Sequence, residues 1–295
     1  MRLRHKVGLD LPPLEEGRAG DPGLFGPGSE VWRVGRERIL LLGGPAALLL
    51  QLAHPLIAAG VANHSDFLAD PFARLRATLD ATLRISFGDS EQAEEAAARV
   101  RATHRGVRGA LEGDVGPFAA GTPYDATDPR LALWVHATLV SVALRSYELL
   151  VGPLLSSQRG GYYREAGRFA RLFGVTDEVL PPTYESFKSY VETIEQSELL
   201  TVGAQARNLA GHVLDPPVPV ILRLSRPASR ALTAGLLPES IRRQLGLPWG
   251  RAERLILKGL NRTSRATITA LPARLRYWEH YRIASKRVQM SVMGE

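Results

Sequence analysis

Histidine is the residue type in this chain best suited to hold a metal or cofactor. The 295 residues include seven histidines and no cysteine, which excludes a thiolate nucleophile, a zinc ribbon, an iron–sulfur cluster and a thiolate-ligated haem. Neutral imidazole is a ligand that zinc, copper, non-haem iron and haem iron share. Any metal or cofactor would therefore be held by His, Asp, Glu, Tyr or backbone atoms.

His104 is set among four arginines in the stretch RVRATHRGVRG, residues 99–109. A helix expected over residues 90–112 places position 104 between Val100 and Val107 on a stripe of small and apolar residues. This spacing predicts that His104 points inward. The alternative is a core histidine that donates one hydrogen bond to a carbonyl.

Three more histidines lie in or beside apolar segments. His136 stands in the most apolar stretch of the chain, and His54 and His64 flank another. Four of the seven histidines thus fall at or next to predicted core positions, where one or two would need no explanation. Each of them also has a purely structural interpretation, as a locally hydrogen-bonded side chain.

Several chemistries are excluded by the motifs they require. The sequence has no His-Glu-x-x-His zinc motif, no pair of Glu-x-x-His helices, no Walker loop, no strand-bound Gly-x-Gly-x-x-Gly and no Gly-x-Ser-x-Gly elbow. The stretch DFLAD at residues 66–70 is too sparse for a magnesium-binding motif. The surviving interpretation is a buried histidine that holds haem from one side, with arginines available for its propionates.

The elements that must position these residues are helices. Residues 1–30 are rich in Gly and Pro and are expected to form an extended arm. Beyond them nearly every segment has helical periodicity, and no alternating strand or hairpin signal is found. The prediction is one all-α domain over residues 31–250, with residues 251–295 as a helical extension packed on it. Helices are expected at residues 45–62, 71–87, 90–112, 129–152, 158–173, 183–199, 201–213, 219–235, 238–245, 250–264 and 272–288.

Composition and charge indicate a soluble globular protein, with 45% hydrophobic and 23% charged residues. The net charge is +7, but the basic residues are spread along the chain, so nucleic-acid binding is not expected. The basic N-terminus is not followed by an apolar stretch, which predicts a cytoplasmic protein. Residues 39–62 are apolar enough for a membrane span, yet Gly43-Gly44-Pro45 and His54-Pro55 interrupt them. A buried core helix is the preferred interpretation, and peripheral membrane contact is the alternative.

Four blocks of sequence, in this order, resemble the MpaB-type oxygenase family, which includes the rubber oxygenases called latex-clearing proteins. The resemblance covers roughly residues 30–250. It implies a globin-like all-α core around a haem b pocket and, in characterised members, dioxygen-dependent cleavage of carbon–carbon double bonds in isoprenoid chains. The blocks are GGPAALLLQLAHPLIAAGVANHSDF (43–67), DPFARLRATLDATLRISFGD (70–89), RVRATHRGVRG (99–109) and GTPYDATDPRLALWVHATLV (121–140).

The resemblance assigns roles to individual residues. The proximal haem histidine of the family lies in an Arg-x-x-His-x-x-Val-Arg pattern, which here reads from Arg101 through His104 to Arg108. His104 is therefore the candidate iron ligand. Arg74 and Thr78 match an Arg and a Thr four apart on the distal helix of the rubber oxygenases. One helical turn places both on one face, where the arginine would polarise bound dioxygen and the threonine would relay a proton.

The sequence also departs from the rubber oxygenases. Position 77 is alanine where they can carry a lysine as a sixth haem ligand, and His136 stands where they tend to have an apolar residue. His136 is thus a further candidate for the distal pocket. Arg145, a charge on an otherwise apolar helix, needs a partner, which is either a haem propionate or a carboxylate such as that of Glu148.

Two functions follow as hypotheses. The first is a haem b-dependent oxygenase that uses dioxygen on a small apolar substrate, isoprenoid-like or a secondary metabolite. The second is a protein that carries haem or an apolar ligand on the same fold without catalysis. The sequence does not indicate an oligomeric state.

Overall fold

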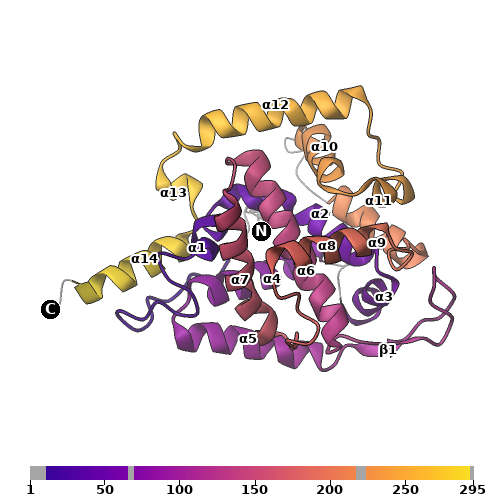
Figure 1. Ribbon diagram of the computed structural model, residues 1–295, viewed down its shortest axis with the longest axis horizontal. Helices are drawn as coiled ribbons and strands as arrows, with labels where there is room; N and C mark the ends of the chain where they lie inside the picture. Colours follow the sequence, from indigo (N-terminus) through magenta and orange to yellow (C-terminus); the bar gives the residue numbers. More distant parts are fainter. Residues whose placement is uncertain (1–10, 66–69, 217–223, 293–295) are drawn as a thin grey trace, which may run out of the picture.

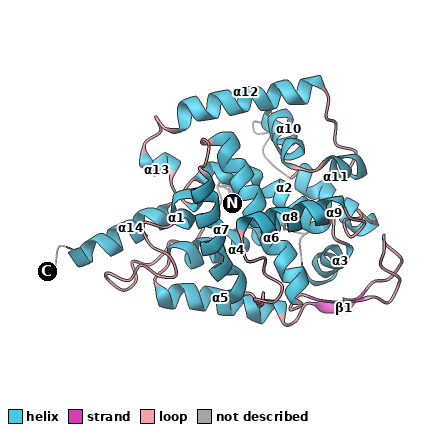
Figure 2. Ribbon diagram, in the orientation of Figure 1, coloured by secondary structure: helices cyan, strands magenta, loops and turns pink. Residues whose placement is uncertain are grey.

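The computed structural model describes residues 11–65, 70–216 and 224–292 and is mostly helical (Figures 1 and 2). The start of the predicted arm and of the predicted helix 219–235 lies outside these residues. The α-helices are α1 (Glu30–Gly35), α2 (Gly44–Leu52), α3 (Pro55–His64), α4 (Pro71–Phe87), α5 (Ser90–His104), α6 (Pro129–Leu150), α7 (Ser156–Leu172), α8 (Tyr184–Gln196), α9 (Ala204–Leu214), α10 (Arg226–Leu236), α11 (Glu239–Gln244), α12 (Arg251–Ile268), α13 (Ala273–Arg276) and α14 (Glu279–Val292). A 3₁₀ helix, η1 (Arg38–Gly43), precedes α2.

Helix α6 lies at the centre of the fold, as its apolar sequence predicts (Figure 1). It packs against α2, η1, α7 and α12. The indole of Trp134 donates a hydrogen bond to the carbonyl of Leu50 at 3.2 Å, and Gln51 donates to the hydroxyl of Thr138 at 3.0 Å. Since both polar contacts satisfy groups that face the core, they fix α2 against α6.

The helix expected over residues 45–62 is broken into α2 and α3, which meet at 106°. Pro55 begins α3, and His54 before it has an extended backbone because the residue before a proline is disfavoured in helical geometry. No single helix in the described part of the chain is long and apolar enough to cross a membrane. Residues 38–52 and 55–64 would be long and apolar enough if taken together, but the chain bends by 106° between them. Most of α2 is buried in the main core.

Helices α4 and α5 form a hairpin whose ends agree with the sequence prediction. Asp70 accepts a hydrogen bond from the backbone of Ala73 at the start of α4, and Gly88 ends that helix. Asp89 and Gln92 then form a reciprocal capping box at the start of α5. The link between the two helices is only Gly88 and Asp89, and α4 and α5 pack against each other.

Helix α5 ends at His104, so the prediction of a helix to residue 112 is wrong. The chain continues into strand β1 (Arg108–Ala110), which pairs antiparallel with β2 (Pro123–Asp125), although no strand signal was found in the sequence. Gly109 lies opposite Tyr124, where a Cβ atom would come within 2.5 Å of the tyrosine hydroxyl. The prediction of an entirely α-helical chain is therefore right except for this small sheet.

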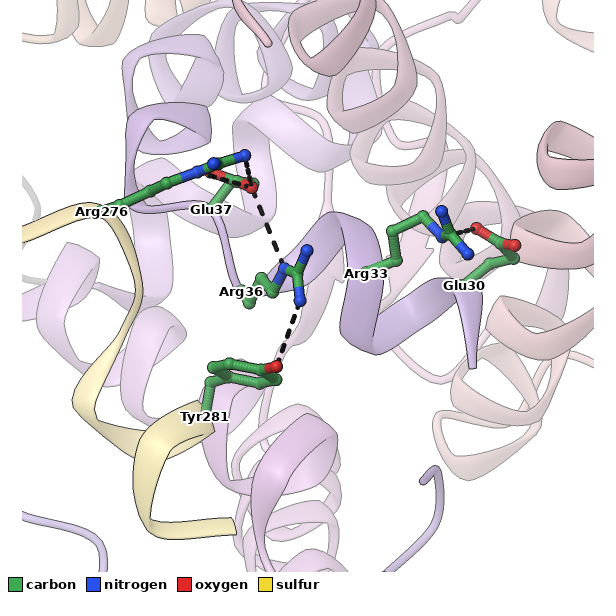
Figure 3. A network of polar contacts seen from close by, with 6 residues as sticks. All are labelled: Glu30, Arg33, Arg36, Glu37, Arg276 and Tyr281. Carbon is green, nitrogen blue, oxygen red and sulfur yellow. Dashed lines mark hydrogen bonds and ion pairs between the residues drawn. The ribbon is translucent and has the colours of Figure 1, made fainter. Parts of the chain in front are cut away.

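The C-terminal segment packs back on the start of the chain, where the predicted helix 272–288 is divided into α13 and α14. The backbone of Trp278 donates to the carbonyl of Arg36 at 3.1 Å. Glu37 is fully buried, and the guanidinium of Arg276 contacts both of its carboxylate oxygens, at 2.7 and 2.9 Å (Figure 3). Arg36 lies 3.9 Å from the same carboxylate and donates to the hydroxyl of Tyr281.

Candidate functional site

His104 is the last residue of α5 and is half-buried. Ala93 and Ala97, on the same helix face, are buried, whereas Val100 is only partly so. This face of α5 therefore becomes more exposed toward the end of the helix, and His104 is less buried than the sequence predicted. Its ring lies near that of Phe173, with 6.3 Å between the ring centroids.

Thr78 and Arg74 lie in the first two turns of α4, the helix that packs against α5 and its last residue, His104. Thr78 is exposed, and so is Ala77. Arg74 precedes Thr78 by four residues, about one turn of the same helix. Three of the predicted site residues thus lie on two helices that pack against each other.

The end of α3 and the β1–β2 hairpin meet at the same end of the fold. Tyr124 accepts a hydrogen bond from Asn63 at 3.1 Å, and its hydroxyl lies 3.2 Å from Nε2 of His64. Val107, whose backbone N–H donates to the carbonyl of His104, lies beside Gly60 of α3. Sequence reasoning missed Asn63 and Tyr124, since nothing in their local pattern signals a contact across 61 residues.

His136 is buried in α6, and its Nε2 has no hydrogen-bond partner among the described residues. Burial lowers its pKa to about 4, so the ring is neutral at pH 7. His54 is also buried, with Nδ1 unpartnered within the described part of the chain, and burial lowers its pKa to about 4 against the opposing effect of Asp128. The described contacts do not join His136 to His104.

The two buried imidazoles make stability depend on pH. An unfolded histidine has a pKa near 6.5, whereas His54 and His136 in the folded protein have pKa values of about 4. Between these values the unfolded state binds protons that the folded state does not. We therefore expect the free energy of unfolding to fall by about 1.4 kcal/mol per pH unit for each histidine as the pH decreases through this window.

Urea unfolding of the wild type and of His136→Leu at a series of pH values measures this effect. Between pH 4 and 6.5, the free energy of unfolding of His136→Leu should depend on pH less steeply than that of the wild type, by the contribution of one histidine. Above pH 6.5 the two curves of unfolding free energy against pH should be parallel. An identical slope in both proteins would show that His136 protonates equally well in the folded and unfolded states.

Arg101 and Arg108, the two arginines of the Arg-x-x-His-x-x-Val-Arg pattern and candidates for binding haem propionates, lie near His104 in the sequence and already contact oxygen atoms. Arg101 pairs with Glu94 at 2.6 Å and donates to the carbonyl of Leu172 at 3.2 Å. Arg108, exposed at the start of β1, donates to the carbonyl of Arg105 at 2.8 Å. Both side chains are exposed or half-exposed, so these contacts are weak enough to exchange for a stronger anion.

Arg145 lies elsewhere, on the face of α6 toward α8 and α10. It pairs with Glu195 at 3.0 Å and donates to the carbonyl of Leu236. The partner expected from the sequence, Glu148, pairs with Arg159 instead. The carboxylate of Glu195 thus neutralises the charge of Arg145. The contacts of Arg145 among the described residues do not place it near His104.

The residues around His104 fit haem by their chemistry. Among the described residues no group of three or more His, Asp or Glu side chains is arranged to hold a metal ion. Haem iron needs only one protein imidazole, with cations for the propionates, and His104 with Arg101 and Arg108 provides that set. The unpartnered ring nitrogen of His136 is a second polar atom of the kind that a bound group would satisfy.

Comparison with known proteins gives one family. A family model described as "ER-bound oxygenase mpaB/B'/Rubber oxygenase, catalytic domain" matches residues 32–266. Two uncharacterized proteins, Rv2237 of Mycobacterium tuberculosis and Mb2261 of Mycobacterium bovis, are each 28% identical over 216 residues, which is 71% of this chain and 81% of theirs. No solved structure matches.

Proposed function

Because the chain belongs to the mpaB/B' and rubber oxygenase catalytic-domain family, we propose that this oxygenase depends on haem b and acts with dioxygen on a small apolar substrate, isoprenoid-like or a secondary metabolite. The observation that supports the proposal is the packing of α4, which carries Arg74 and Thr78, against α5, which ends at His104.

His104 would hold the iron through its imidazole, and Arg101 and Arg108 would bind the propionates. When bound, haem supplies the chemistry that activates dioxygen.

Arg74 and Thr78 act on the substrate side. The guanidinium of Arg74 would favour negative charge that develops on dioxygen, and Oγ1 of Thr78 would donate a proton to it. Since Thr78 is exposed, its hydroxyl can regain the proton from water. Ala77 offers no ligand in place of the lysine of the rubber oxygenases.

An absorption spectrum after reconstitution with haem, followed by a dioxygen-consumption assay, tests the proposal. We expect a Soret band and dioxygen uptake that depends on an isoprenoid alkene such as squalene. Absence of the band would overturn haem dependence. A band without dioxygen uptake across a panel of alkenes would instead indicate the second hypothesis, a haem or apolar-ligand carrier.

Replacing Thr78 by Val should slow turnover without releasing haem. The variant removes only a hydroxyl, so kcat should fall by about 100-fold while the Soret band keeps its intensity. Thr78→Ser should recover most of the activity. Thr82→Val is the matched control, because the Thr82 hydroxyl bonds the carbonyl of Thr78 within the helix. Equal losses in Thr78→Val and Thr82→Val would mean that the effect comes from helix packing and not from a proton relay.

A further inference from the structure

Helix α12 lies along an outer edge of the molecule and packs through one face only (Figure 1). Leu257 and Leu260 contact the main core, and Ile268 is buried. Asn261 donates a hydrogen bond to the carbonyl of Leu149 at the end of α6. These contacts fix the rotation of the helix and therefore settle which side chains face outward.

The outward side is strongly basic. Its cations are exposed and carry no ion pair with an acidic side chain among the described residues. The one acidic residue of α12, Glu253, caps the backbone of Gly250 and lies on the side toward α10. We define the α12 outer face as Arg251, Leu255, Lys258 and Arg262. Arg265, one turn after Asn261, lies toward the core and donates to the carbonyl of Glu148 on α6.

Exposed leucines accompany these cations. Leu255, in the middle of the face, has 59% of its surface exposed, and Leu271 and Leu275 just beyond the helix have 41% and 58% exposed. Arg274 continues the basic pattern between them. A row of cations alone is a common solvated surface, whereas cations with large exposed apolar side chains nearby suit a partner that is both anionic and apolar.

We propose that the α12 outer face docks the protein on a lipid surface that contains anionic headgroups. The helix axis would lie in the plane of the bilayer, with Leu255 at the boundary of the acyl chains and the cations at the phosphates. An RNA or an acidic peptide would match the cations but not the three exposed leucines. This face is distinct from residues 39–62, whose helices bury most of their apolar residues in the core.

Flotation of the full-length protein with vesicles tests the proposal. We expect binding to vesicles of phosphatidylglycerol and phosphatidylcholine, little binding to phosphatidylcholine alone, and release by salt. The double variant Lys258→Glu with Arg262→Glu should bind at least about 10-fold more weakly, since each cation near an anionic surface contributes about a 5-fold factor. Leu255→Ser should weaken binding about 10-fold through the loss of apolar insertion.

The matched control is Arg99→Glu with Lys188→Glu, which changes the net charge equally at exposed positions on α5 and α8. In Figure 1, α5 lies at the edge opposite α12. Equal weakening in both double variants would show non-specific attraction and overturn the proposal. So would absence of vesicle binding, or a dimer in solution that only the α12 variant dissociates, which would make this face a contact between two copies. The measurement needs neither haem nor turnover, so its outcome is independent of the proposed function.

Discussion

Replacing Arg276 by Met should lower the free energy of unfolding by about 3–5 kcal/mol. The guanidinium contacts both oxygens of Glu37, whose carboxylate has no exposed surface (Figure 3). Without the guanidinium of Arg276, the one cation within 4 Å of the Glu37 carboxylate in the described part of the chain would be Arg36, at 3.9 Å. The cost of an uncompensated buried charge exceeds that of the lost contact itself, because water cannot reach the carboxylate.

Chemical denaturation of three variants measures this effect. Arg171→Met, which breaks the exposed pair with Asp177, should cost less than about 1 kcal/mol. The double variant Glu37→Leu with Arg276→Met should recover most of the loss, since both charges are replaced by apolar groups of similar size. If Arg276→Met lowers the free energy of unfolding no more than Arg171→Met does, Glu37 is not left as an unpaired buried anion in the variant. The interpretation of the Glu37–Arg276 contact as a buried ion pair would then be wrong.

Replacing His104 by Ala should abolish the Soret band of the reconstituted protein. Loss of an iron ligand should weaken haem binding by more than about 100-fold, because loss of groups that merely orient a ligand already costs 10–100-fold. Dioxygen uptake should disappear with the band. Added imidazole should restore part of the band, a result that a purely structural histidine would not produce.

His212→Ala is the matched control, since His212 also stands in the last turn of a helix and contacts only the carbonyl of Asn208. This variant should keep the band and the activity. A band that persists in His104→Ala but is lost in His136→Leu would assign the iron to the buried histidine of α6. In that case the hairpin argument would be wrong, although haem dependence would stand.

The helix ends that the sequence predicted correctly are those with local chemical signals. Asp70 with Pro71 starts α4, and Gly88 with Asp89 separates α4 from α5, because capping side chains and the fixed proline angle act within one turn. The end of α5 was missed although Gly106, directly after the C-cap residue Arg105, is a local signal for a helix end. This helix end is also followed by pairing of β1 with β2 across the intervening loop, a contact that helical periodicity cannot represent.

Burial in the candidate site was predictable where periodicity was strong. His136 is buried as its apolar helix implied, and His104 lies on the expected face although it is only half-buried. Partners distant in sequence could not be predicted: Arg145 contacts Glu195, 50 residues away, and Tyr124 meets His64 across 60. Such pairs follow from the packing of helices, which no local pattern specifies.

The separation of 239 residues between Glu37 and Arg276 also bears on how the protein is made. During synthesis Glu37 leaves the ribosome long before its cation exists, so the first helices cannot bury that carboxylate in its final state. Closing so long a loop is slow and comes late in folding. Folding of the nascent chain therefore includes a built-in delay, because Glu37 can gain its buried cation only after all the residues up to Arg276 have been synthesised.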